Sequence, residues 1–562
     1  MNSSANLKVD IEEAVRPADD EVEVKDENGN AVGDIDHVSK LKYAPEQFLS
    51  GDEKRPLQYT DSTGHTYTYV LKPTMYCVLM ILLLEACERF AYYGISFTLN
   101  NFLIGFYNHD WSPDFTPPQA ATYVGTGTSV AYAFPVVGAI LADGFFGTFR
   151  TTAVSTLLIY IPGLFLIALS AKPDLFSEFS LTMFSVAYYG MYAVGAGVIK
   201  SCVNILGANQ YHPVVHKHQI ATYYVRFYTF INIGALLGGL TVPLNLAKDS
   251  GSMQFYMYLC PPIVLCVGYI IFVAGSRRYV KTVPAGSVIL QSFMAGCSAL
   301  TSCSLKKQTV EHGGKYSATF IENLRSMGHV IVLMALTLPF SIIYSQMTGI
   351  FMSQGAVMKN AGLINSGFLN NFDAISVLIA GFVVGNLLYP FLEKRGINLN
   401  MMTKFAFGNL LSVISVLLGI WIDHHMKSTY QESLNDPTKD AQISILWMAL
   451  PYALIGFGEI FVYSTSYAIA FGASPDGFKA MGSAINLLFI GCFSNLINTA
   501  LINACTDMLT DPTDRKADID TMEKYSRTRF NDFYWIIAGV GLFGAVICFL
   551  PWTRKYYNYV EQ

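Results

Sequence analysis

The sequence predicts an all-α polytopic membrane protein with twelve transmembrane helices in two six-helix bundles. Of its 562 residues, 52% are hydrophobic and only 14% are charged, a composition typical of a chain that lies mostly within a bilayer. Hydropathy windows give about twelve apolar stretches, each near the roughly 20 residues that a helix needs to cross the hydrocarbon core. A more polar segment separates the first six stretches from the last six.

The elements follow in order along the chain. Residues 1–72 are rich in Asp, Glu, Asn and Gly and predict a disordered cytoplasmic tail. The polar segment 276–327 predicts a cytoplasmic linker, in which the amphipathic stretch 288–300 would lie along the membrane surface. We expect bundles at 73–275 and 328–553 and a short cytoplasmic tail at 554–562. The predicted spans are 74–106, 119–143, 151–171, 181–206, 221–246, 255–275, 329–359, 372–392, 402–424, 443–472, 481–505 and 532–551.

The distribution of Lys and Arg predicts that both termini are cytoplasmic. Arg277, Arg278 and Lys281 follow the sixth span, and most other basic residues fall on the same side under this assignment. The last outer loop, 506–531, breaks the pattern, but its acidic residues offset its basic ones. We expect a plasma-membrane protein, with the vacuolar membrane as the alternative, and a monomer as the functional unit.

Composition also excludes several classes of function. A net charge of −5 indicates no nucleic-acid partner. No nucleophile–base arrangement, P-loop or metal-ligand spacing is present, so we expect neither an enzyme nor a metal or other cofactor.

The first span holds three charged side chains within an apolar run. A charge at the centre of a membrane helix costs about 2.5–3.5 kcal/mol, so these groups must face protein or water rather than lipid. Helical periodicity places Glu85, Glu88, Arg89 and Tyr92 on one face, where Glu85 and Arg89 are spaced to pair. The cluster is either a buried ion pair that fixes helix packing or, through its excess carboxylate, a proton carrier.

Two further charged pairs are candidates for gates. Lys200 in the fourth span follows a Gly-rich stretch, and Glu459 lies in the tenth span. A Lys200–Glu459 pair would join the two halves and close one end of a cavity, or it would be a static salt bridge. The segment 138–150 resembles the short signature between the second and third helices of the major facilitator superfamily. There Asp143 and Arg150 would latch neighbouring helices, or they would form an ordinary helix-capping pair.

Other polar side chains complete a candidate binding site between the halves. Asn232 offers an amide in the first half, and Gln346 and Asp373 offer polar groups in the second, although a membrane Asn or Gln is often only helix-packing glue. Cations would then lie in the N-terminal half and an anion in the C-terminal half, which suits a zwitterion such as a short peptide or an amino acid. The tyrosines that could line the cavity are Tyr92, Tyr93, Tyr123 and Tyr132.

Several segments together resemble the proton-dependent oligopeptide transporter family of the major facilitator superfamily, in its eukaryotic, fungal-type branch. The first-helix motif Glu85-x-x-Glu88-Arg89-Phe90-x-Tyr92-Tyr93-Gly94 matches in every defined position. The other matching segments are 138–147, Phe227-Tyr228-x-x-Ile231-Asn232-x-Gly234, the Gly-rich approach to Lys200, and Glu459-Ile460-Phe461.

The resemblance implies roles for these positions. Glu85 and Glu88 would couple protons, with Arg89 as their partner. Arg89 and Lys200 would hold the peptide carboxylate, and Asn232 and Glu459 would meet its amino terminus. Alternatively, Arg89 and Lys200 would exchange ion-pair partners during turnover. Tyr92, Tyr93 and Tyr132 would shape the pocket.

Departures from the family pattern concern coupling and substrate range. Ser201 stands for a proline after Lys200, Ser345 precedes Gln346 where a gating carboxylate is common, and Gly125 stands for a second-helix His. Asp373 is followed by Ala374 instead of proline. Coupling would therefore depend more on the first-helix acids.

The function expected from these features is proton-driven import of di- and tripeptides by alternating access. The alternatives are a transporter of nitrate or another small solute, and a nutrient sensor derived from such a transporter. An anion site would gain little from Glu459, and a sensor would be favoured by a large ordered cytoplasmic domain, which the sequence does not predict.

Overall fold

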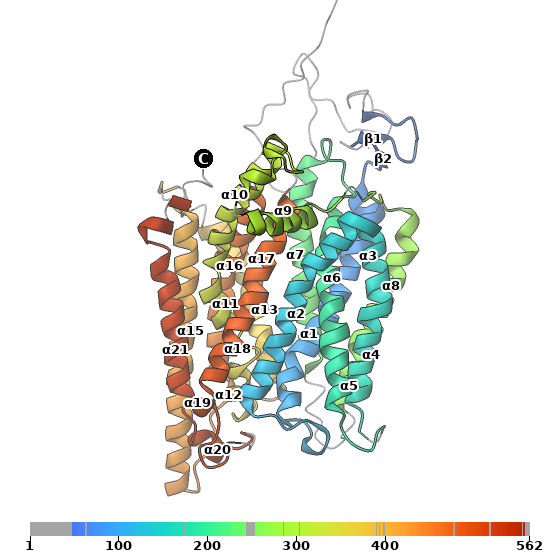
Figure 1. The fold of residues 1–562 in the computed structure, drawn as a ribbon. Helices are drawn as coiled ribbons and strands as arrows, with labels where there is room; N and C mark the ends of the chain where they lie inside the picture. Colours follow the sequence, from blue (N-terminus) through green and yellow to red (C-terminus); the bar gives the residue numbers. More distant parts are fainter. Residues whose placement is uncertain are drawn as a thin grey trace, which may run out of the picture.

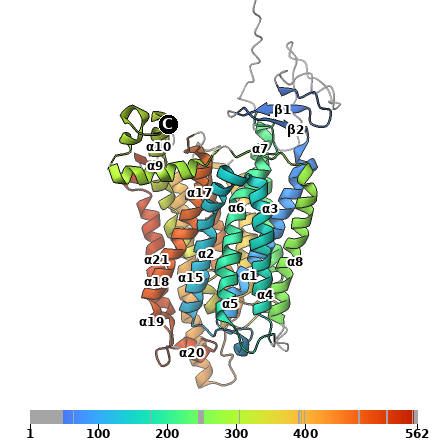
Figure 2. The same ribbon diagram turned by 45° about the vertical axis from the view of Figure 1, so that its right-hand side comes forward.

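The two halves of the chain lie side by side as bundles of long helices (Figure 1). The computed structural model describes residues 48–61, 64–173, 175–242, 253–284, 286–302, 304–388, 391–392, 394–396, 399–475, 478–515, 519–553 and 555–556. We name the two ends of the bundle after short helices that lie there (Figures 1 and 2). The α9 end carries α9 (Val288–Ser302), and the α20 end carries α20 (Met522–Ser526).

The first six predicted spans coincide with helices of the N-terminal half. These helices are α1 (Leu79–Leu103), α2 (Pro117–Leu141), α3 (Thr148–Ser155), α4 (Ile161–Ser170), α5 (Leu181–Ser185), α6 (Val194–Ala208), α7 (Lys217–Gly239) and α8 (Met253–Ala274). π-helical stretches extend or join them at Thr74–Val78, Ala142–Phe146, Thr156–Tyr160 and Val186–Ala193, and short 3₁₀ turns lie at His109–Trp111 and Gly275–Arg277. One predicted span thus corresponds to α3 with α4, and another to α5 with α6.

The C-terminal half contains the other six predicted spans. Its helices are α10 (Ala318–Ala335), α11 (Leu338–Tyr344), α12 (Ile350–Ala356), α13 (Asn370–Val383), α15 (Met401–Asn435), α16 (Ala449–Gly472), α17 (Lys479–Leu487), α18 (Ser494–Ala504), α19 (Thr506–Leu509) and α21 (Phe530–Ile547). π-helical stretches lie at Val384–Leu388 and Leu488–Phe493, and 3₁₀ turns lie at Lys306–Gln308, Val310–His312, Gly367–Leu369 and Ile445–Met448.

The predicted boundaries are wrong at the end of the ninth span, where α15 runs to Asn435 instead of residue 424, and most of all at the seventh span. It was expected as one helix over 329–359, but it begins earlier, with Ser317 capping α10 through Phe320 N at 3.1 Å, and it breaks twice. Pro339 stands at the start of α11, where the axis bends by 43° from α10. The second break separates α11 from α12 and ends at Gly349, the residue before α12. The predicted linker therefore ends at α10 rather than at residue 327.

Length and composition support most of the predicted spans. Eight helices within the described residues are long and apolar enough to cross a membrane, or nine if the bent pair α10–α11 is one span. The other three predicted spans correspond to α1, α7 and α13. The charges of Glu85, Glu88 and Arg89 lie in α1, and α13 belongs to a shorter apolar helix, Gly367–Val383.

A β-hairpin precedes the first span and corrects part of the tail prediction. Strands β1 (Leu57–Thr60) and β2 (Thr66–Tyr69) pair antiparallel, with Leu57 opposite Tyr69. Both of these side chains are buried with Val280 of the linker, and the Arg55 guanidinium donates to the carbonyl of Arg278 at 2.9 Å. The prediction of disorder over 1–72 is wrong here, because alternating Tyr and Thr form strands that pack on the linker. Residues 1–47 lie outside the described residues.

The amphipathic stretch 288–300 forms helix α9, which runs across the bundle axis at its end (Figure 2). Ile289, on its buried face, shares an apolar cluster with Ala139 of α2 and Ala484 of α17, so α9 contacts both halves. Phe293 and Met294 are exposed on the other face.

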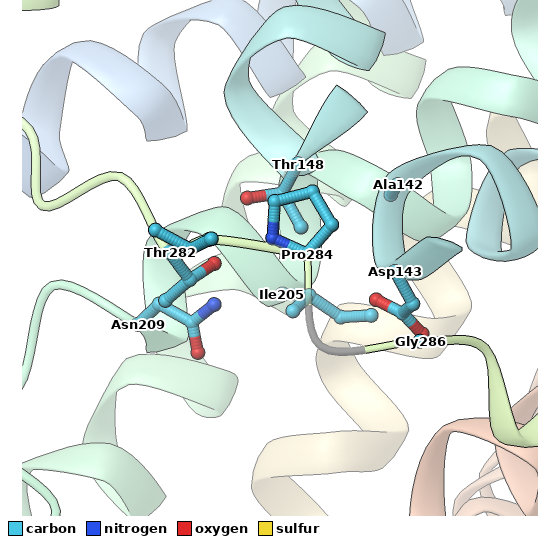
Figure 3. Close-up of a pocket in the computed structure, with 9 residues that line it drawn as sticks. Ala142, Asp143, Thr148, Ile205, Asn209, Thr282, Pro284 and Gly286 are labelled. Atoms are coloured by element: carbon cyan, nitrogen blue, oxygen red, sulfur yellow. The ribbon is translucent and has the colours of Figure 1, made fainter. Parts of the chain in front are cut away.

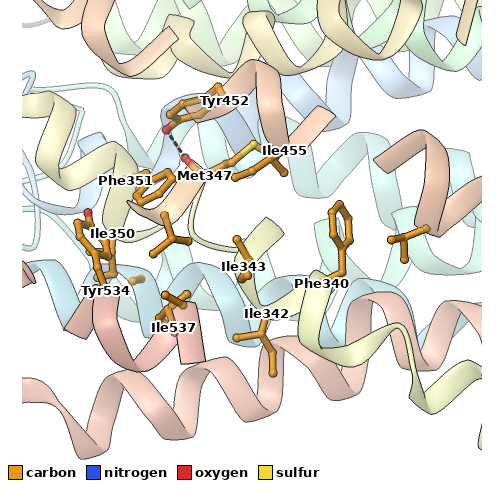
Figure 4. Close-up of a cluster of buried hydrophobic side chains, with 14 of the residues drawn as sticks. Phe340, Ile342, Ile343, Met347, Ile350, Phe351, Tyr452, Ile455, Tyr534 and Ile537 are labelled. Atoms are coloured by element: carbon orange, nitrogen blue, oxygen red, sulfur yellow. Dashed lines mark hydrogen bonds between the residues drawn. The ribbon is translucent and has the colours of Figure 1, made fainter. Parts of the chain in front are cut away.

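Each half has its own apolar core. In the C-terminal half, the broken seventh span contributes Phe340 and Phe351, which pack with fully buried side chains of other helices such as Tyr452 and Tyr534 (Figure 4). The break leaves backbone carbonyls without helical partners. The Tyr452 hydroxyl donates to one of them, Met347 O, at 2.6 Å.

Hydrogen bonds between the halves close the α20 end. Asn100 Nδ2 donates to Ser353 Oγ at 3.0 Å, and Asn101 Nδ2 donates to Ser366 Oγ at 2.7 Å. These bonds join the last turns of α1 to α12 and to the segment before α13, so the ends of the two halves are held together here.

The loop 506–531 also lies at the α20 end, and its described basic residues are paired with acids. Arg527 Nη1 lies 3.3 Å from Asp511 Oδ2, and Lys524 Nζ lies 2.8 Å from Asp520 Oδ1. This pairing explains how the loop can depart from the Lys and Arg pattern of the rest of the chain.

Candidate functional site

The predicted charge cluster on α1 is buried and paired. Glu85, Glu88 and Arg89 have relative exposures of 2%, 0% and 4%. Arg89 Nε lies 3.2 Å from Glu85 Oε1, which confirms the expected i,i+4 pair, and the guanidinium also binds Glu88 Oε2. Glu85 Oε2 and Glu88 Oε1 remain without hydrogen-bond partners, so both acids keep an unused acceptor.

Helix α7 packs closely on this cluster because a glycine lies at the crossing. A Cβ atom on Gly234 would stand 2.7 Å from Arg89 Cβ, so any larger residue would push the helices apart. Asn232, two residues earlier, is 7% exposed, and its Nδ2 donates to Tyr228 O at 2.9 Å. Asn232 therefore lies near the cluster, with its amide hydrogen-bonded to its own helix.

Lys200 of α6 is held by aromatic rings. Its Nζ lies 4.4 Å from the ring centroid of Tyr92 and 3.7 Å from that of Tyr132, and no hydrogen-bond partner is present among the described residues. The Arg89 guanidinium lies 5.1 Å from the Tyr92 ring, which also packs edge-on against Tyr93. Two cations of the N-terminal half thus share one tyrosine wall, which consists of Tyr92, Tyr93 and Tyr132.

The predicted Lys200–Glu459 pair is not formed in this conformation. No ion pair joins these residues in the described structure; instead, Glu459 Oε1 accepts a hydrogen bond from the Tyr228 hydroxyl at 3.3 Å. Tyr132 interacts with both residues, because its ring lies 3.7 Å from Lys200 Nζ and the Glu459 carboxyl acts on its hydroxyl electrostatically. The structure therefore shows the two halves with this connection broken.

Asp373 of α13 is the close neighbour of Glu459. The helices α13 and α16 approach at Gly456, where a Cβ atom would stand 2.7 Å from Asp373 Oδ1. Glu459 follows Gly456 by one helical turn, and the Tyr344 hydroxyl of α11 contacts both carboxyls. Asp373 Oδ1 has no hydrogen-bond partner. Sequence reasoning identifies Asp373 only as one of several polar groups in the candidate binding site, without a role of its own.

Gln346 lies apart from this cluster. Its Nε2 donates to Asn498 Oδ1 of α18 at 2.6 Å and to Ile342 O at 2.9 Å, and its side chain is fully buried. Both bonds are to residues of the C-terminal half, as expected for a residue that joins helices.

The predicted latch between Asp143 and Arg150 is not formed in the described structure: no ion pair joins the two side chains, and Arg150 is exposed. Asp143 lines a cavity of about 140 Å³ between the end of α2, α6 and the linker (Figure 3). The linker reaches it through Gly286 N, which donates to the Asp143 carbonyl at 3.1 Å. A main-chain hydrogen bond, rather than an ion pair between Asp143 and Arg150, therefore connects this π-helical turn to the linker.

Four tyrosines of the site were missed by sequence reasoning: Tyr228, Tyr344, Tyr463 and Tyr467. All interact with the Glu459 carboxyl. Tyr463 and Tyr467 follow Glu459 at intervals of four residues, so helical spacing was a usable signal for them. No spacing connects Tyr344 with Glu459, which only the packing of α11 on α16 brings together.

The chain matches the model of the POT family over residues 149–522. Its relatives include the probable peptide transporter ptr2 of Schizosaccharomyces pombe, 25% identical over 75% of this chain and 72% of that one. Another is the peptide transporter PTR2 of Saccharomyces cerevisiae, 24% identical over 86% of this chain and 80% of that one. The protein NRT1/PTR family 8.2 of Arabidopsis thaliana is 25% identical over 84% of this chain and 92% of its own length.

The fold agrees with solved structures. The crystal structure of the POT family transporter PepTSo superimposes with a TM-score of 0.67, covering 85% of this chain and 98% of that one at 21% identity. This likeness confirms the predicted all-α major facilitator fold. With the family model matching well over half of its length, this chain belongs to the POT family, whose members are multi-pass membrane transporters and not enzymes.

Proposed function

We propose that this protein is a proton-coupled symporter that imports di- and tripeptides by alternating access. The observation that carries the proposal is the opposite charge of the two halves around one tyrosine wall. Arg89 and Lys200 contact it from the N-terminal half, and Glu459 interacts with Tyr132 from the C-terminal half, with Asp373 beside Glu459. A short peptide carries a carboxylate and an ammonium at opposite ends and matches both.

Several polar atoms of these groups lack a hydrogen-bond partner, which supports ligand binding. Lys200 Nζ lacks a hydrogen-bond partner, as do one oxygen each of Glu85, Glu88 and Asp373. Leaving a buried polar atom unpaired costs about 1–3 kcal/mol, so such atoms persist where a ligand or a proton satisfies them during function. Purely structural ion pairs would be expected to use these positions within the protein.

The relatives support the substrate class. The two fungal relatives named above are described as peptide transporters, one of them as probable. A small anion such as nitrate would be attracted by Arg89 and Lys200 but would meet two carboxyls at the other side. We also propose the plasma membrane as the location. The α9 end would be cytoplasmic, because the basic residues Arg277, Arg278 and Lys281 lie at that end.

The test is uptake of radiolabelled dialanine by purified protein in proteoliposomes, with and without an inward proton gradient. We expect accumulation above the external concentration only with the gradient, and its collapse on addition of a protonophore. Excess unlabelled dipeptide should compete and nitrate should not. Uptake that ignores the gradient, or that nitrate blocks, would contradict the proposal.

The matched variant is Glu85→Gln, which keeps the shape of the side chain and removes its proton. We expect it to accumulate less dipeptide for the same proton gradient while still exchanging labelled for unlabelled dipeptide, because binding and rocking remain. If the variant accumulates dipeptide like the wild type, Glu85 is not a coupling residue.

A further inference from the structure

We propose that Asp373 and Glu459 form a second proton-binding unit, located in the C-terminal half, which holds one proton while a ligand ammonium is bound. This inference rests on the proposed peptide transport. It assigns to Asp373 a role in proton coupling, and it makes the proton count of the cycle depend on both halves.

The first argument is geometric. Because Gly456 has no side chain, α13 approaches α16 until Asp373 Oδ1 lies only 2.7 Å from the position that a Cβ atom would take. Ser376, one turn after Asp373, occupies the same contact and donates to Asp373 O at 2.8 Å, which fixes this part of α13. Glu459, one turn after Gly456, is thereby brought beside Asp373, and Tyr344 contacts both carboxyls.

The second argument is the absence of a counter-charge. The groups that interact with these two carboxyls come from α1, α2, α7, α11 and α16, and among the described residues all are tyrosines: Tyr93, Tyr132, Tyr228, Tyr344, Tyr452, Tyr463 and Tyr467. No Lys, Arg or His is among them. A tyrosine hydroxyl donates one hydrogen bond but supplies no positive charge. Two neighbouring carboxylates in a medium of low dielectric constant do not both stay ionised, so one proton is shared between them.

The third argument is the charge of each half with a peptide bound. In the N-terminal half, Glu85 and Glu88 balance Arg89 and Lys200, so a ligand carboxylate leaves one negative charge in excess. In the C-terminal half, a ligand ammonium neutralises only one of Asp373 and Glu459, and again one negative charge remains. One proton on an oxygen of each half makes the loaded site neutral, which lowers the cost of moving it through the bilayer centre.

The test is the number of protons carried with each dipeptide, obtained from the reversal potential of dialanine flux in proteoliposomes. We expect two protons per dipeptide in the wild type and one in Asp373→Asn, in which the ammonium neutralises Glu459 alone. Asp373→Glu restores a carboxyl and should restore two. The control is Asp423→Asn, which removes a buried carboxyl of α15 bonded to Tyr525 and Lys427, outside the site, and should leave the ratio unchanged.

A ratio of one in the wild type, or the same ratio in Asp373→Asn as in the wild type, would overturn the inference. Failure of the proposed function has another signature, namely no proton-driven dialanine flux in the wild type. If Asp373→Asn does not fold, the reversal potential of dialanine flux in Glu85→Gln decides the matter. With the N-terminal acid neutralised, we expect this variant still to carry one proton per dipeptide on the C-terminal pair, and none if that pair is not a proton site.

Discussion

The two halves solve the same physical problem in different ways. Both hold two carboxyls within the bundle, where a lone charge is expensive, but in the C-terminal half Asp373 is buried and Glu459 only half-buried. Only the N-terminal half supplies cations, with Arg89 contacting both Glu85 and Glu88. The C-terminal half surrounds Asp373 and Glu459 with tyrosine hydroxyls instead. The comparison indicates that the N-terminal half is balanced before a ligand arrives, whereas the C-terminal half depends on the ligand and a proton for its balance.

The largest effect should come from removing the cation that balances the N-terminal half. Arg89→Gln leaves two buried carboxyls without their ion-pair partner and with only Lys200 as a counter-charge, and breaking a buried pair from one side costs about 3–5 kcal/mol. We expect loss of dipeptide uptake and a lower thermal unfolding temperature of the purified protein.

A matched control separates stability from transport. Lys427→Gln breaks another i,i+4 pair, with the buried Asp423 at 3.0 Å, outside the site. We expect this variant to be less stable and yet to transport. Equal transport loss in both variants would mean that Arg89 acts only through the fold.

The second effect tests which half meets which end of the ligand. Lys200→Gln removes an ammonium that lies on the Tyr92 and Tyr132 rings without a hydrogen-bond partner, so the fold should survive. A hydrogen bond to a charged group contributes about 1.5–3 kcal/mol, which corresponds to roughly 10- to 100-fold weaker binding of dialanine. Dialanine amide, which lacks the carboxylate, should compete about equally well against both proteins.

The corresponding variant in the C-terminal half tests the other end of the ligand. Glu459→Gln should weaken dialanine more than N-acetyl-dialanine, which carries no ammonium. Competition assays against labelled dialanine measure both ratios. The same pattern of loss for Lys200→Gln and Glu459→Gln would show that the ligand does not lie across the two halves in this direction.

Sequence reasoning reached the N-terminal site more fully than the C-terminal one, and the reason is physical. Glu85, Glu88 and Arg89 lie within one turn of one helix, so periodicity alone predicts their pairing. Asp373 and Glu459 lie on different helices, and their proximity depends on how closely α13 can approach Gly456, which no local pattern encodes.

The same distinction applies to the fold. Apolar length predicts where helices cross, and amphipathic spacing predicts α9, because both are local properties. The expected pairs Lys200–Glu459 and Asp143–Arg150 require two helices in one particular arrangement, and the structure shows another. The breaks of the seventh span and the packing of the hairpin on the linker likewise depend on tertiary contacts.

A smaller effect is expected for the hydroxyl that contacts both C-terminal carboxyls. Tyr344→Phe removes one hydrogen-bond donor and keeps the ring, and a neutral hydrogen bond contributes about 0.5–1.5 kcal/mol. We expect up to about tenfold weaker dialanine binding, measured as KM of uptake. The control is Tyr534→Phe, whose hydroxyl donates to Gln354 Oε1 at 2.8 Å in the core, and which should change stability but not KM. An unchanged KM in Tyr344→Phe would mean that other tyrosines satisfy the pair.

The smallest effect is expected from two histidines of the N-terminal half that lie outside the membrane spans. Unlike the carboxyls of the two sites, they are buried in their neutral form. The loop before α7 buries His212 and His216 as neutral rings that hold the hairpin. His212 Nδ1 accepts from Val215 N at 3.0 Å, while its other nitrogen bonds to Gln58 O of β1 at 3.0 Å. His216 Nδ1 accepts from His212 N at 3.0 Å, and its ring bonds to the Leu71 carbonyl.

Because each ring uses one nitrogen as an acceptor, protonation would break a bond on each. Burial, with the neighbouring His212, lowers the pKa of His216 to about 4, and burial also lowers the pKa of His212. A histidine whose pKa is lowered by docking stabilises the docked state fully above its ordinary pKa. This stabilisation is lost as the pH falls from about 6.5 toward 4, by at most about 1.4 kcal/mol per pH unit for each ring.

We therefore expect amide exchange in the hairpin, corrected for the intrinsic pH dependence, to be constant between about pH 8 and 7 and to rise below about pH 6.5. The control is His216→Gln, whose amide can both accept from His212 N and donate to Leu71 O but does not titrate in this range. Its exchange should rise less steeply with acid. Exchange that is independent of pH in the wild type would mean that the aromatic packing of Phe48, Tyr59 and Tyr69 around His212 holds the hairpin without these bonds.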